Sequence, residues 1–278
     1  MKMAEWTGRE KIVLDEINDW AEKLKTAGKE GDGRKQKLDS LFSHFSDEAL
    51  ENIHEKIDAV LFQICSFADE NLPYGHEIEK ILAAGRLFDS SVATIPDMRK
   101  LTIDQAGFIA ARQQAKYRRF SLFEGALSGT GKAVFAAADP FFLLAVNLRA
   151  VQLTGAAYGF ETKTPGGLVA ALKMVLMAAA PDMVKYALWE ELMDELEARE
   201  PGFYVENDKL FHRYLWPGAI GHAGKLAFLT LLRPKKRGEN SWAGMAIGAL
   251  TNYYFSKKVC EIAEKYYQYR FLTEKSGL

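Results

Sequence analysis

Large apolar residues recur every three to four positions along this chain, and that spacing restricts it to helices that bury one face. Val13, Ile17, Trp20 and Leu24 keep this spacing, with charged residues between them. The pattern returns at 53–64 and in later segments. No segment shows the alternation of period two that is typical of a half-buried strand. We therefore predict an all-α fold.

Local signals mark where several of these helices begin. Thr102 followed three residues later by Gln105 fits the capping box, in which each side chain satisfies a free backbone amide. Asp139 and Thr164 each precede a proline. An oxygen-bearing cap followed by proline at the first helical position is a common helix start. We predict helix starts at all three places.

The second half of the chain has small residues between its large apolar ones. Two apolar stretches, 216–232 and 241–256, flank a short basic loop. Gly244 and Gly248 have the GxxxG spacing that lets two helices approach closely. We predict a multi-helix single domain that includes a glycine-rich apolar C-terminal helical hairpin with a cationic tip. The basic residues of the tip are Arg233, Lys235, Lys236 and Arg237.

The 278 residues suffice for one large domain, and we expect the N-terminal helices of 1–94 to pack against a core of 95–278. A net charge of −1 gives no overall attraction to nucleic acid, so we expect no such partner. Two cysteines without a disulfide pattern favour a reducing compartment. No apolar run reaches the roughly 18 residues of a spanning helix. We expect a cytoplasmic location, with the inner face of a membrane as a place of work.

A polar network is predicted around two charges in an apolar segment. Asp139 and Arg149 lie about 15 Å apart along a straight helix, so they cannot pair directly. Asp139 is then a helix cap, and Arg149 needs a partner on another helix, for which Glu124 and Glu190 are candidates. Such a network is either structural or part of a functional site. Further candidate members are Asn147, Tyr158 and Asn252.

A second basic cluster, Lys116, Arg118 and Arg119, lies beside Tyr117 and Phe120. Cations beside aromatic residues fit an anionic membrane surface, where each contributes about 1 kcal/mol of attraction. The alternative is a solvated surface that keeps the protein soluble. The aromatic platforms on which RNA bases stack are missing from the pattern.

The sequence predicts neither a cofactor nor a metal site. The segment 126–133 (ALSGTGKA) approaches a phosphate-binding loop, but its first glycine and its magnesium-binding hydroxyl are replaced by alanine. His54 and His76 each begin a zinc-protease pattern whose second histidine is absent. We also find no nucleophile with an assigned base.

Short motifs in the second half carry a family resemblance through their order and spacing. They are EGALSG at 124–129, ADP at 138–140, NLRAVQ at 147–152, YGF at 158–160, GMAIG at 244–248, NYY at 252–254 and YRFL at 269–272. Together they resemble the EcsC protein family over about residues 95–275. Lys132 departs from the small residue expected there. The resemblance implies a bacterial protein from a family whose name comes from an association with an ABC-type exporter, and it implies no particular reaction.

Three hypotheses follow. The first is a non-enzymatic, membrane-associated helical protein that is accessory to an ABC-type transport or envelope process, with a transporter component as a possible partner. The second is a small-ligand binder or hydrolase with a polar pocket around Asp139, Arg149, Tyr158 and Asn252. The third is a scaffold that binds a partner helix through its GxxxG residues.

Overall fold

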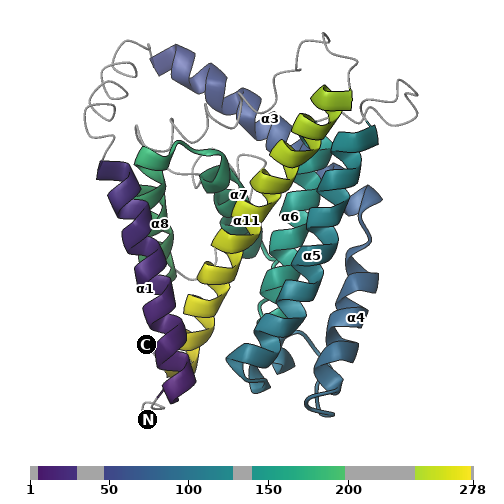
Figure 1. Ribbon diagram of the computed structural model, residues 1–278, viewed down its shortest axis with the longest axis vertical. Coiled ribbons are helices and arrows are strands. Elements are labelled where there is room, and N and C mark those ends of the chain that lie inside the picture. Colours follow the sequence, from purple (N-terminus) through teal and green to yellow (C-terminus); the bar gives the residue numbers. More distant parts are fainter. Residues whose placement is uncertain (1–5, 30–46, 128–139, 198–241, 277–278) are drawn as a thin grey trace.

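The computed structural model describes residues 6–29, 47–127, 140–197 and 242–276, and every regular element in these ranges is a helix. The predicted all-α fold is confirmed. In Figure 1, α1 and α8 lie at one side, α11 crosses the middle, and α5, α6 and α4 lie at the other side. The elements in chain order are α1 (Gly8–Lys29), α3 (Asp47–Asn71), α4 (Tyr74–Arg86), the 3-10 helix η1 (Pro96–Lys100), α5 (Ile103–Leu127), α6 (Pro140–Ala157), α7 (Pro165–Ala179), α8 (Asp182–Glu197) and α11 (Trp242–Ser276).

Two of the three predicted helix starts are confirmed with their caps. The Thr102 amide donates to Gln105 Oε1 at 2.9 Å, and the Gln105 amide donates to Thr102 Oγ1 at 3.3 Å, which is the reciprocal capping box. At the start of α7, Thr164 Oγ1 accepts from the Gly167 amide at 3.2 Å. Helix α6 begins where predicted, but Asp139 lies outside the described residues, so its capping role stays a prediction.

Helix α6 occupies the centre of the fold. Every residue of 144–160 is buried, and α6 contacts α3, α4, α5, α7 and α11. A helix covered on several sides needs no polar face, which explains why its sequence is apolar almost all round. The same core includes Val13 and Ile17 of α1, and α1 meets α8 through Trp20 and Trp189, whose ring centroids lie 4.9 Å apart.

Helix α11 runs antiparallel to α5. Ser256 Oγ donates to Ser121 Oγ at 2.7 Å, and Gln114 Nε2 donates to the Cys260 carbonyl oxygen at 3.4 Å. The second arm of the predicted hairpin belongs to this 35-residue helix, which continues well beyond residue 256. Gly244 and Gly248 fall in its first turns, but the first arm, 216–232, lies outside the described residues, so the hairpin itself stays a prediction.

Helix α6 and helix α11 approach closely at Gly155. A Cβ atom there would lie 2.5 Å from Thr162 Cγ2 and 2.6 Å from the Tyr267 ring, so only glycine fits. The chain then leaves α6 through Gly159, whose φ of +86° is a conformation that favours glycine.

None of the described helices has the length and apolarity needed to cross a bilayer.

Candidate functional site

Arg149 is the most deeply buried charge of the predicted polar network. Its side chain is fully buried. Its guanidinium donates to Gln152 Oε1 at 2.7 Å, to the Ala68 carbonyl oxygen at 2.7 Å and to Asp69 Oδ1 at 3.0 Å. The predicted partner on another helix therefore exists, and it is Asp69 of α3, which was not one of the two candidates.

Asp69 joins Arg149 to a second cation. Lys163 Nζ lies 2.8 Å from the same Oδ1 atom, and the Tyr74 ring faces both cations, at 5.0 Å from Arg149 and 5.1 Å from Lys163. Partial burial raises the pKa of Asp69, but the hydrogen bonds from Lys163 and Arg149 outweigh it and leave the pKa below its usual range. This cluster ties α3, α4 and α6 together, which is a structural role.

The other members of the predicted network that the structure describes do not gather around Arg149. Asn147 Nδ2 donates to the Leu143 carbonyl within α6 at 2.7 Å, and the fully buried Tyr158 packs against Phe271 at 6.1 Å between ring centroids. Asn252 is partly buried on α11. Among the described residues, no hydrogen bond joins any two of Asn147, Arg149, Tyr158 and Asn252.

Two predicted members of the network cannot be assessed. Glu124 belongs to α5, but its side chain lies outside the described part of the structure, and Asp139 lies outside it entirely.

Lys116 contacts a buried carboxylate rather than standing free. Its Nζ lies 2.7 Å from Glu77 Oε2, and Lys80 Nζ lies 3.0 Å from the other oxygen. The Glu77 side chain is only 2% exposed. Burial raises the pKa of Glu77, but the two lysines outweigh that effect and lower it. The charge of Lys116 is thus largely compensated by the Glu77 carboxylate within the protein.

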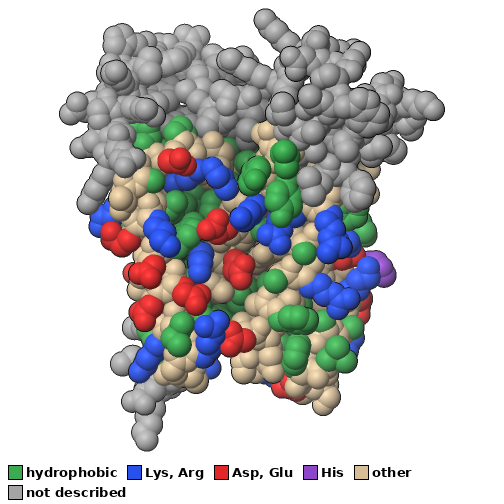
Figure 2. Space-filling model, viewed as in Figure 1, with side chains coloured by type: hydrophobic (Ala, Val, Ile, Leu, Met, Phe, Trp, Pro, Cys, Tyr) green, Lys and Arg blue, Asp and Glu red, His purple; other side chains and the backbone are tan. Residues whose placement is uncertain are grey.

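The antiparallel pair α5 and α11 carries four other cations and several exposed apolar side chains. None of the four forms an ion pair with a described residue. Phe120 is 47% exposed, Leu250 51% and Tyr254 60%. Figure 2 shows Lys, Arg and apolar side chains side by side over the upper parts of these helices. We call these seven residues of α5 and α11 the basic–aromatic strip: Arg118, Arg119, Phe120, Leu250, Tyr254, Lys257 and Lys258.

Buried thiols are poor nucleophiles here. Burial raises the pKa of Cys65 and of Cys260 to about 12, so both stay protonated at neutral pH. Nor do three or more His, Cys, Asp and Glu side chains gather as metal ligands anywhere in the described ranges. The predicted basic tip, Arg233, Lys235, Lys236 and Arg237, lies outside these ranges.

Sequence reasoning missed Asp69, Glu77 and the Lys257–Lys258 pair. The lysine pair had a local signal, because two adjacent cations closely follow the three aromatic residues at 253–255. Asp69 and Glu77 had none, because their partners come from helices distant in the sequence.

These features define an all-α protein whose buried charges hold its helices together and whose unpaired charges lie on its surface. The EcsC protein family model matches residues 11–228, and the chain belongs to that family. The match includes α1, α3 and α4, which precede the motifs that carried the resemblance. No curated protein and no solved structure matches the chain.

Proposed function

We propose that this chain is a non-enzymatic peripheral membrane protein that binds anionic lipid headgroups through the basic–aromatic strip. The observation that carries the proposal is that the antiparallel pair α5 and α11 carries four cations without an ion pair to a described residue and three exposed apolar side chains. Each cation near an anionic bilayer contributes about 1 kcal/mol, and aromatic rings favour the interface between lipid and water.

The predicted basic tip supports the same role. Only four residues separate Arg237 from Trp242, the first residue of α11. The tip and the strip would then act as two basic elements on one membrane contact. The role would be cytoplasmic, at the inner face of the membrane, and accessory to an ABC-type transport or envelope process, to which the family name points.

The test is co-sedimentation with vesicles of phosphatidylcholine alone and of phosphatidylcholine with phosphatidylglycerol, at low and moderate salt. We expect binding to the anionic vesicles alone, weakened by salt. The double variant Arg119→Glu with Lys257→Glu should weaken it at least tenfold. A matched control is Lys11→Glu with Lys23→Glu, which makes the same charge change at two exposed positions on α1 and should leave binding unchanged.

A third variant separates the two basic elements. Lys235→Glu, Lys236→Glu and Arg237→Glu together should also weaken binding if the tip takes part. Equal binding of the strip variant and the α1 control would remove the strip from the function. Equal binding to both kinds of vesicle would contradict an electrostatic contact.

A further inference from the structure

Three large apolar side chains stay exposed where α4 ends beside α5. Leu87 is 84% exposed, Phe108 63% and Phe88 45%. The rings of Phe88 and Phe108 meet edge to face with their centroids 6.4 Å apart, so the turn after α4 contacts α5 through rings that water still reaches. We call these three residues the apolar patch. Figure 2 shows hydrophobic side chains over the lower ends of α4 and α5, with Lys and Arg side chains above them.

The turn that carries Leu87 and Phe88 is fixed by the packing beneath it. The Phe88 amide donates to the Gly85 carbonyl oxygen at 2.9 Å. Gly85 is buried, and a Cβ atom there would lie 2.6 Å from Met98 Sδ, so α4 packs tightly against η1. The core thus holds the backbone of the turn and leaves the Leu87 side chain outside. Because a polar side chain at position 87 would leave this packing intact, the fold does not require a leucine there, and exposed apolar clusters mark interaction sites.

The surface of α5 that continues from Phe108 carries cations and no acid. Residues 105–123 include no aspartate or glutamate. Phe108, Arg112 and Arg119 are exposed, and their spacings of four and seven residues place them on one face of the helix, over about 16 Å. Arg112 has no acid partner among the described residues. Since Arg119 belongs to the basic–aromatic strip, this face of α5 connects the strip with the apolar patch.

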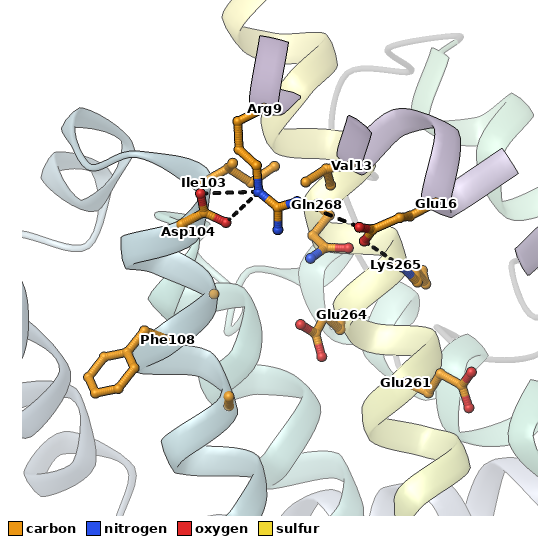
Figure 3. Close-up of a pocket in the computed structure, with 12 residues that line it drawn as sticks. Arg9, Val13, Glu16, Ile103, Asp104, Phe108, Glu261, Glu264, Lys265 and Gln268 are labelled. Carbon is orange, nitrogen blue, oxygen red and sulfur yellow. Dashed lines mark hydrogen bonds and ion pairs between the residues drawn. The ribbon is translucent and has the colours of Figure 1, made fainter. Parts of the chain in front are cut away.

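The acids near this surface lie on the side of α5 that faces α1 and α11. A polar cleft of about 440 Å³ opens there between the three helices. In Figure 3, Asp104 pairs with Arg9, and Glu261 and Glu264 project from α11, whereas the Phe108 ring points away from the other labelled side chains. An anionic bilayer would therefore be repelled on the cleft side of α5 and attracted on the side of α4.

Both the charge and the shape of this surface fit a lipid bilayer. Cations bind anionic headgroups, while leucine and aromatic side chains enter the boundary between headgroups and acyl chains. Leu87 protrudes from the surface, and a fluid bilayer closes around a protruding side chain without needing a matching pocket.

We propose that the apolar patch is a second membrane anchor, which enters the interface of an anionic bilayer while the cations of α5 bind its headgroups. This inference rests on the proposed function and adds an orientation to it. Helix α5 lies along the bilayer surface from Phe108 to Arg119, instead of meeting the bilayer with one end only.

An environment-sensitive fluorophore on single introduced cysteines tests the anchor in the full chain. Leu87→Cys carries the probe in the patch, and Tyr254→Cys carries it in the strip. Ile12→Cys on α1 is the matched control, because it also replaces an exposed apolar residue. Burial raises the pKa of the native thiols Cys65 and Cys260 to about 12, so a maleimide at neutral pH reacts with the introduced cysteine. The vesicles are phosphatidylcholine with phosphatidylglycerol.

We expect the emission of the probe at position 87 to rise on these vesicles and to be quenched by a nitroxide on the acyl chain, and the probe at position 12 to show neither effect. A silent probe at position 87, or equal responses at 87 and 12, would overturn the anchor. If the probe at position 254 still responds, the proposed function stands without the anchor. If the protein does not co-sediment with the vesicles at all, the proposed function fails as well.

The double variant Leu87→Ser with Phe108→Ser measures what the patch contributes to affinity. It should weaken vesicle binding at moderate salt at least tenfold, because burying a leucine or phenylalanine side chain is strongly favourable. Ile12→Ser should bind as the wild type does. Leu87→Ser alone, at the more exposed position, should weaken binding several-fold with unchanged urea unfolding, which separates lost binding from lost folding.

Two results with these variants would overturn the anchor. The first is binding of the double variant equal to that of Ile12→Ser. The second is self-association of the wild type in sedimentation velocity, without vesicles, that Leu87→Ser abolishes. That result would assign the patch to a second copy of the chain.

Discussion

Arg149 and Asp69, from two different helices, share a hydrogen bond of 3.0 Å between a fully buried guanidinium and a half-exposed carboxylate. The pair is asymmetric. Arg149 has lost all contact with water and depends on its protein partners, whereas Asp69 keeps water and a second cation, Lys163. Removing the Asp69 carboxylate should therefore lower the stability of the fold mainly because the buried Arg149 loses a hydrogen-bond acceptor. The loss of the other contacts of Asp69 should contribute less.

Asp69→Ala should lower the free energy of unfolding by about 1–2 kcal/mol, because Arg149 keeps Ala68 and Gln152 as acceptors and water screens the exposed side of the pair. Urea unfolding followed by circular dichroism measures this loss. The exposed Asp19→Ala should stay within about 0.5 kcal/mol of the wild type. Equal stability of the two variants would contradict the structural role of Asp69.

The same pair predicts a pH effect. The pKa of Asp69 in the folded protein lies below its unfolded value, so its stabilisation is present above about pH 4 and is lost as pH falls through the folded pKa. The stability difference between wild type and Asp69→Asn should therefore shrink below that pH. Unfolding curves at pH 7, 5 and 3 measure this stability difference. A difference that grows as the pH falls would contradict a lowered pKa for Asp69.

Gly155→Ala should destabilise the fold by about 1–3 kcal/mol or more, because the added methyl would overlap the Tyr267 ring and Thr162. The control is Gly75→Ala in the first turn of α4, where an added Cβ meets nothing within 4 Å. That change should be neutral or stabilising, by up to about 1 kcal/mol. Thermal unfolding of the two variants gives the comparison.

Lys116→Gln and Arg119→Gln should separate stability from membrane binding. Loss of Lys116 leaves the buried Glu77 with one lysine, which should cost about 1–3 kcal/mol of unfolding free energy with little change in vesicle binding. Loss of the exposed Arg119 should weaken vesicle binding with little change in the free energy of unfolding. Urea unfolding and vesicle co-sedimentation of both variants test this separation. If Lys116→Gln bound vesicles more weakly without losing stability, Lys116 would belong to the membrane contact.

Glu264→Gln should stabilise the protein at neutral pH. Burial raises the pKa of Glu264, so the folded state favours its protonated form, and the stability that the neutral form contributes is lost as pH rises through the folded pKa. Glutamine stays neutral, so the gain should appear at pH 7 and vanish below about pH 4. Equal stability at pH 7 would mean that nearby cations fully compensate this carboxylate.

The sequence predicts structural features that depend on residues within one or two helical turns of each other. The Thr102–Gln105 box and the Thr164 cap were predictable because donor and acceptor lie three residues apart. That Arg149 needs a partner was also predictable, because a buried charge is costly. The identity of that partner was not, because it depends on how α3 packs against α6.

The same dependence on helix packing explains why the candidate membrane surface was predicted only in part. Lys116 looked like Arg118 and Arg119 because all three stand in one basic run, and only the packing of α4 against α5 shows that Glu77 engages the first of them. The cleft between α1, α5 and α11 was not predicted either, because its residues come from three helices far apart in the sequence and share no motif.

Residues of the basic–aromatic strip and of the cleft both lie on helix α11. Lys257 of the strip and Glu264 of the cleft are seven residues apart, or about 10 Å along an unbroken helix. A helix of this kind tilts or slides as a unit, so neither surface can be displaced without moving the other. A force that a bilayer exerts on the strip would therefore also act on the wall that α11 contributes to the cleft.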